Sequence, residues 1–219
     1  MIEAVIFDMD GVLIDSEPVW QRTEVELFRD LGITLTREMQ VQTKGLRSDE
    51  MVNYWYARFP GNHPSPGEMV EKYEDRMIHA FKNDIELMEG AETSILFFRD
   101  LELPVALASS SPTFLIDIFL DRFGLGDYFS VIYSAEKEPF GKPHPNVYLN
   151  TANLLQCDPT RCLAIEDSFH GLIAAKAAKM KVIVFPGPGE DDDPRFGAAD
   201  YRIKALTEIN KCIFDKLNN

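Results

Sequence analysis

Short runs of apolar residues recur along the chain, and helical stretches or loops separate them. Four of these runs cover residues 4–7, 105–108, 162–165 and 182–185, and a weaker run covers residues 131–133. The four are apolar at every position, which is typical of strands that are buried on both faces of a parallel sheet. Their alternation with helical stretches predicts an open α/β sheet.

Two segments between these runs have a helical pattern. Apolar residues recur at helical spacing over residues 112–124, where Ser111 is the expected N-cap, Pro112 the first helical residue and Gly124 the end. An alanine-rich segment predicts a second helix over residues 171–180. Both helices would connect neighbouring strands of the sheet.

Residues 15–90 interrupt this alternation, because they contain no convincing strand and instead three or four amphipathic helices. We expect Ser16 to cap the first of these helices and Ser48 to cap the second. The predicted fold class is therefore α/β. A Rossmann-like parallel sheet core would be formed by residues 1–14 and 91–219, and an all-helical cap domain would be inserted between its first two strands.

The composition argues against several classes of protein. With 36 Asp and Glu against 22 Lys and Arg, the 219-residue chain carries a formal charge of −14. Nucleic acids and anionic membranes are bound by clustered basic residues, so neither is expected as a partner. A hydrophobic fraction of 45% is sufficient for a packed core. Nothing in the sequence implies an obligate protein partner.

The sequence also bears on the expected location of the protein. It has no run of about 18 apolar residues that could cross a bilayer, and its N-terminal apolar stretch is too short for a secretory signal. The odd number of cysteines, without the spacing of zinc or redox motifs, is typical of reduced thiols. These features predict a cytoplasmic protein.

Polar residues gather where the predicted strands end. Asp8 and Asp10 follow the first run, Ser109 and Ser110 the second, and the pair Glu166-Asp167 the run over residues 162–165. Lys142 follows the weaker run across a loop. Ligands of open parallel sheets bind beyond the carboxyl ends of the strands, so we expect these side chains to meet at one edge.

The chemistry of this set favours phosphoryl transfer. Oxygen ligands from Asp8 and Asp167 suit Mg²⁺. Ser109, the backbone of Ser110 and the N-terminus of the following helix offer donors to phosphate oxygens, and Lys142 adds a positive charge. The cofactor that we expect is therefore Mg²⁺, and the expected partner is a small phosphorylated metabolite.

Two carboxylates could divide the chemical steps between them. Asp8 could attack phosphorus and form an aspartyl-phosphate, while Asp10 could protonate the departing oxygen and later deprotonate water. Each site alone has a structural alternative, since an Asp after a strand is often a turn former or cap, and Lys142 could be a solvated loop lysine. Glu166 could ligate the ion, reach it through water, or be an exposed neighbour.

Four motifs in order resemble those of the haloacid dehalogenase superfamily. They are DMDGVLIDS from Asp8, ASSS around Ser109, GKP around Lys142, and EDS from Glu166. The resemblance implies that Asp8 is the nucleophile and Asp10 the acid and base, that Ser109, Ser110 and Lys142 bind phosphate, and that Asp8, the Asp10 backbone carbonyl and Asp167 hold Mg²⁺. An insertion after the first motif is similar to that of the helical-cap subclass.

Within that subclass, the chain looks like the bacterial hexitol-phosphate and 2-deoxyglucose-6-phosphate phosphatases. The resemblance implies hydrolysis of hexose-6-phosphates, 2-deoxyglucose-6-phosphate or hexitol phosphates, with Trp20, Lys44 and Arg47 as cap contacts to the substrate. Trp20 stands where β-phosphoglucomutases have a histidine, which weakens the alternative of a phosphosugar mutase. A non-catalytic phosphosugar-binding protein is the second alternative, although binding alone requires no second carboxylate.

Overall fold

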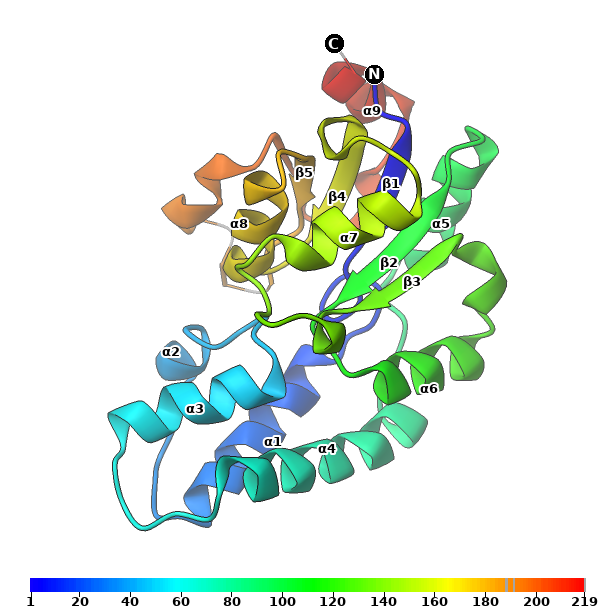
Figure 1. Ribbon diagram of the computed structural model, residues 1–219. Helices are drawn as coiled ribbons and strands as arrows, with labels where there is room; N and C mark the ends of the chain where they lie inside the picture. Colours follow the sequence, from blue (N-terminus) through cyan, green and yellow to red (C-terminus); the bar gives the residue numbers. More distant parts are fainter. Residues whose placement is uncertain (188, 191, 219) are drawn as a thin grey trace.

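The computed structural model describes residues 1–187, 189–190 and 192–218. Within these residues one sheet has the strand order β3-β2-β1-β4-β5-β6, and every neighbouring pair is parallel (Figure 1). The strands are β1 (Ala4–Phe7), β2 (Val105–Ser109), β3 (Val131–Ser134), β4 (Cys162–Glu166), β5 (Lys181–Val184) and β6 (Tyr201–Arg202). All five predicted strands are confirmed, and the two-residue β6 was not predicted.

Helices cover both faces of this sheet. Alternate residues of β1 point to opposite faces, so Val5 and Phe7 pack on one side and Ala4 and Ile6 on the other. The first side is covered by α5 (Ala91–Asp100), α6 (Thr113–Phe123) and α9 (Lys211–Asn218), and the second by α7 (Asn146–Leu154) and α8 (Phe169–Ala177). The sheet is therefore the middle of three layers, as expected for a Rossmann-like core.

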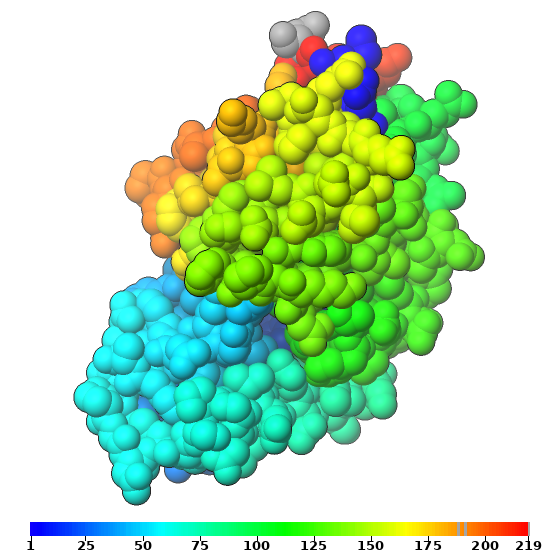
Figure 2. Space-filling model, in the orientation of Figure 1, coloured from blue at the N-terminus to red at the C-terminus, as the bar shows by residue number. Residues whose placement is uncertain are grey.

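Four helices follow one another between β1 and α5. They are α1 (Glu17–Arg29), α2 (Arg37–Gln40), α3 (Ser48–Arg58) and α4 (Pro66–Asn83). Leu27, Phe28, Val52 and Trp55 form a hydrophobic cluster of their own, separate from the two clusters on the sheet. These helices make a lobe at one end of the molecule (Figure 2), so the predicted helical insertion is confirmed, whereas its boundaries at 15 and 90 stay a prediction.

Three predicted helix starts differ from the structure. The helix expected to be capped by Ser48 is α3, which begins at Ser48 and has Arg47 at its N-cap position. The helix expected from Pro112 begins at Thr113, because the backbone of Pro112 is extended and places it at the N-cap position, while the Ser111 hydroxyl binds Asp10. The helix expected over 171–180 is α8, which begins at Phe169 because Ser168 caps it through the Gly171 amide.

Short 3₁₀ helices complete the described chain. They cover Gly126–Tyr128, Ala135–Lys137, Pro159–Arg161, Pro194–Ala198 and Leu206–Glu208. None of the described helices is both long enough and apolar enough to cross a lipid bilayer.

The separate core of the four inserted helices leads to a stability prediction. Phe28 has no exposed surface, so Phe28→Ala should lower the free energy of unfolding by about 3–5 kcal/mol in chemical denaturation. Phe140 is 61% exposed, and Phe140→Ala should change it by less than about 0.5 kcal/mol. Equal effects of the two substitutions would contradict the buried position of Phe28 in the core of the lobe.

Candidate active site

A buried lysine joins three strands at the carboxyl edge of the sheet. Lys142 is 1% exposed, and its ammonium group donates to Asp8 Oδ1 at 2.6 Å, to Glu166 Oε1 at 2.7 Å and to the Ala108 carbonyl at 3.3 Å. Asp8 follows β1, Ala108 belongs to β2 and Glu166 ends β4. An ammonium group has three N–H bonds, so all of its donors are engaged here. In this arrangement Lys142 positions Asp8, and its predicted contact with phosphate stays a prediction.

Glu166 anchors this lysine and is not an exposed neighbour of Asp167. It is completely buried, and its second oxygen, Oε2, accepts hydrogen bonds from the amides of Asp167 and Ser168 and from the Ser168 hydroxyl. The Tyr148 hydroxyl donates to its first oxygen beside Lys142. Both carboxylate oxygens are thus in use within the protein.

A second lysine reaches the site from the inserted lobe. Lys44 Nζ lies 2.9 Å from Asp167 Oδ2 and 3.1 Å from Glu190 Oε2. Burial lowers the pKa of Lys44, but the nearby carboxylates, first Asp167, outweigh burial and leave its pKa raised, so it is positively charged. In this structure Lys44 therefore contacts Asp167, a candidate metal ligand, and its predicted contact with the substrate stays a prediction.

Asp10 accepts hydrogen bonds from four side chains. Ser16 Oγ and Trp20 Nε1 donate to its Oδ1 at 2.6 and 2.7 Å, and Ser111 Oγ and Ser109 Oγ donate to its Oδ2 at 2.7 and 3.4 Å. Ser16 lies at the N-cap position of α1, as expected, but its hydroxyl makes no capping bond because it binds Asp10. Residues from the loop before α1, from α1, from the end of β2 and from the loop after β2 together fix the orientation of this carboxylate.

The inserted helices are docked on the sheet through a short segment. The Gly45 carbonyl accepts from Ser110 Oγ at 2.8 Å, and Arg47 Nη1 donates to the carbonyls of Ala135 and Glu138 at 3.0 and 2.6 Å. Arg47 does not line the cavity around Asp8, and its predicted contact with substrate stays a prediction. The Ser110 side chain takes part in this docking through its hydrogen bond to the Gly45 carbonyl.

Three buried carboxylates offer a site for a cation. Asp8, Glu166 and Asp167 each place an oxygen atom within 4.8 Å of the others. Gly11 lies against this group with a φ of +73°, and a Cβ there would come within 2.2 Å of Asp167 Oδ2. Burial raises the pKa of Asp8, although the positive charge of Lys142 opposes this effect. Burial likewise raises the pKa of Asp167 to about 6, although Lys44 opposes it.

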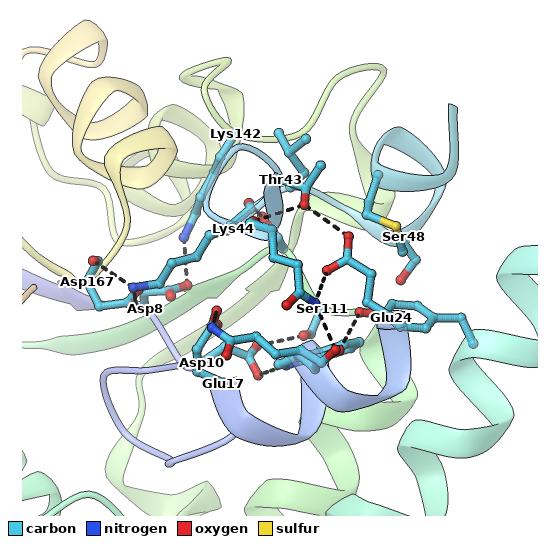
Figure 3. A pocket seen from close by; sticks show the side chains of 18 residues that line it. Asp8, Asp10, Glu17, Glu24, Thr43, Lys44, Ser48, Ser111, Lys142 and Asp167 are labelled. Carbon is cyan, nitrogen blue, oxygen red and sulfur yellow. Dashed lines mark hydrogen bonds and ion pairs between the residues drawn. The ribbon is translucent and has the colours of Figure 1, made fainter. Parts of the chain in front are cut away.

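The cavity around Asp8 and Asp10 has a polar wall from the inserted lobe that sequence reasoning missed. Figure 3 shows Asp8 and Asp167 at one end of this cavity and Glu24 with Thr43 at the other. The missed lining residues include Glu17, Gln21, Glu24, Gln40 and Thr43. One signal was available: Glu24 lies four residues from Trp20 and from Phe28, within the apolar stripe of α1.

A family comparison agrees with the order of these residues along the chain. The model of the haloacid dehalogenase-like hydrolases matches residues 5–185, which include Asp8, Asp10, Lys142 and Asp167. The chain belongs to this family. Its fold is shared by a crystal structure of CbbY from Rhodobacter sphaeroides in complex with phosphate, with a TM-score of 0.81, 26% identity, and coverage of 95% of this chain and 96% of that one.

Curated relatives include named phosphatases. Hexitol phosphatase B of Escherichia coli K12 is 45% identical over 95% of this chain and 94% of its own length. The putative phosphatase YhcW of Bacillus subtilis is 30% identical over 100% of this chain and 99% of its own length. This haloacid dehalogenase-like hydrolase is thus similar to both along nearly its whole length.

The raised pKa of Asp167 makes binding of a divalent cation depend on pH. A carboxylate must lose its proton to ligate Mg²⁺, so the association constant for Mg²⁺ should fall as the pH falls through about 6. The fall should reach up to about tenfold per pH unit for each proton that binding releases. Isothermal titration calorimetry with MgCl₂ measures this. Asp167→Asn should abolish the binding, and the exposed Asp127→Asn should retain it. An affinity that is independent of pH would contradict the assignment.

Proposed function

We propose that this protein is a Mg²⁺-dependent phosphomonoester hydrolase that acts on small sugar phosphates through an aspartyl-phosphate on Asp8. The substrates would be hexose-6-phosphates, 2-deoxyglucose-6-phosphate and hexitol phosphates. The observation that carries the proposal is the position of Asp8, whose carboxylate is fixed by Lys142 beside Asp10 in a cavity walled by the inserted helices. The similarity to hexitol phosphatase B supports the substrate class.

In the first step the Asp8 carboxylate attacks phosphorus. Lys142 holds Oδ1, which leaves Oδ2 as the attacking atom. A bond forms between this oxygen and phosphorus, and the bond from phosphorus to the sugar oxygen breaks. Asp10, in its protonated form, gives its proton to that departing oxygen, so the sugar leaves as a neutral alcohol.

In the second step water replaces Asp8 on phosphorus. Asp10, now a carboxylate, takes a proton from the attacking water, the bond between Asp8 and phosphorus breaks, and inorganic phosphate leaves. The donors on Asp10 from Ser16, Trp20 and Ser111 keep one orientation available for both proton transfers. Asp8 ends as the carboxylate with which it began.

The donor set at the edge of the sheet fits Mg²⁺. All the available side-chain ligands are carboxylate oxygens, the type that this hard cation prefers. Asp8 and Asp167 would hold the ion, together with the Asp10 backbone carbonyl, whereas both oxygens of Glu166 already have partners. When bound, Mg²⁺ neutralises charge on the phosphate oxygens.

The surroundings of Asp10 support hydrolysis over the mutase alternative. Trp20 occupies the position where the resemblance places a histidine in mutases, and it donates its indole N–H to Asp10. An indole nitrogen is a donor only and cannot take a proton from a sugar hydroxyl. With Trp20 in that position, water is the acceptor that we expect for the phosphoryl group.

A phosphate-release assay over hexose, hexitol, pentose and triose phosphates with Mg²⁺ tests this function. The wild-type protein should release inorganic phosphate, fastest from hexose or hexitol phosphates. Asp8→Asn should lower kcat at least about a thousandfold because it removes the nucleophile, and the exposed Asp100→Asn should leave kcat unchanged. Isomerised sugar phosphate without phosphate release would establish a mutase, and an active Asp8→Asn variant would contradict the mechanism.

A further inference from the structure

The far end of the cavity contains a buried carboxylate that the chemical steps above do not use. Glu24 lies on the apolar stripe of α1, is 5% exposed, and lines the cavity on the side opposite Asp8 (Figure 3). Its place among apolar neighbours is costly for a carboxylate, because burial disfavours the charged form. Burial is also the main influence that raises the pKa of Glu24.

Three neutral groups from different elements hold Glu24 in place. Trp55 Nε1 and Thr43 Oγ1 donate to its Oε1 at 2.6 and 3.1 Å, and Gln40 Nε2 donates to its Oε2 at 2.9 Å. Gln40 is itself fixed by a second bond to the Gln21 carbonyl at 2.8 Å. The carboxylate is therefore preorganised, and its orientation does not depend on a ligand.

The acceptor capacity of Glu24 is not exhausted by these partners. Two carboxylate oxygens offer about four acceptor positions, and three donors occupy them here. The cationic groups that line the cavity, Lys44 and Lys142, are bound to Asp167 and Asp8 at the other end. The far end is thus an acceptor-rich, negatively charged wall, suited to hydroxyl donors and unsuited to a second phosphate.

We propose that Glu24 is a specificity-determining residue, which accepts hydrogen bonds from hydroxyls of the leaving group and disfavours substrates with a second phosphate at that end. This inference rests on the proposed function and narrows its substrate class to monophosphates of polyhydroxylated alcohols. A substrate that fills the cavity removes water from the Glu24 carboxylate. A hydroxyl of the leaving group would replace the hydrogen bond that is lost with that water. A terminal phosphate would instead bring about two further negative charges against Glu24.

The test compares wild type and Glu24→Gln on a hexitol monophosphate, an aryl monophosphate without hydroxyls, and a hexitol bisphosphate. The variant should lose about 10- to 100-fold in kcat/KM on the hexitol monophosphate and less than about twofold on the aryl phosphate. Its ratio of bisphosphate to monophosphate turnover should rise. Glu74→Gln is the matched control, because Glu74 is a partly buried carboxylate of α4 that does not line this cavity.

Other outcomes overturn the proposal. If Glu24→Gln lowers kcat/KM equally on all three substrates, Glu24 has a purely structural role. The same holds if the ratio of bisphosphate to monophosphate turnover is unchanged. If Glu24→Gln does not fold in a thermal melt, wild type is assayed on a series of monodeoxy hexitol phosphates. A loss of about tenfold or more for at least one member supports the proposal, and values all within about twofold overturn it.

Failure of the proposed function gives a different result from failure of this inference. A wild-type protein that releases phosphate from none of the three substrates lacks the proposed activity. Calorimetric binding of the hexitol monophosphate to wild type and Glu24→Gln then decides the role of Glu24. An affinity about tenfold weaker in the variant supports that role, and equal affinities overturn it.

Discussion

The ion pairs of Lys142 are the interaction on which the site depends. A fully buried ammonium group lies between the carboxylates of Asp8 and Glu166, so charges that would each be costly in the interior compensate one another. Because these groups come from the ends of β1 and β4 and from the loop after β3, the pairing fixes how the strand ends meet. Removing the lysine would leave two buried carboxylates without a cation.

The same balance of charge extends to the inserted helices. Lys44 brings a second ammonium group to Asp167, while the Gly45 carbonyl and Arg47 bind the sheet side of the molecule. The docked position of the lobe is therefore stabilised by the carboxylates that would hold a cation. In a chain with a net charge of −14, the two lysines thus offset part of the negative charge of the carboxylates at this edge of the sheet.

Local patterns predict much of this molecule, and distant contacts account for what they miss. The run from Ala4 to Phe7 predicts a buried strand because every residue is apolar, and Asp8 follows at the edge where parallel strands place ligands. The strand Tyr201–Arg202 was not predicted, because two residues are too few to show a hydrophobic period. Most of the chemistry-bearing residues around Asp8 could thus be predicted.

The surroundings of these residues could not be predicted in the same way. The Trp20 indole and the Ser111 hydroxyl both bind Asp10, yet they lie 10 and 101 residues from it along the chain. Glu24 meets Trp55 and Gln40 only because three segments of the lobe fold together. One sequence shows that a serine can cap a helix, but tertiary structure decides that Ser16 and Ser111 serve a carboxylate instead.

In the proposed hydrolysis, Asp8, held by Lys142, carries the phosphoryl group between the two steps. The most direct measurement is rapid acid quenching of the wild-type protein during turnover of a hexose or hexitol phosphate with Mg²⁺, followed by peptide mapping by mass spectrometry. We expect a phosphoryl group on the peptide that contains Asp8, and specifically on that residue. A phosphoryl group on another residue, or none during active turnover, would contradict it.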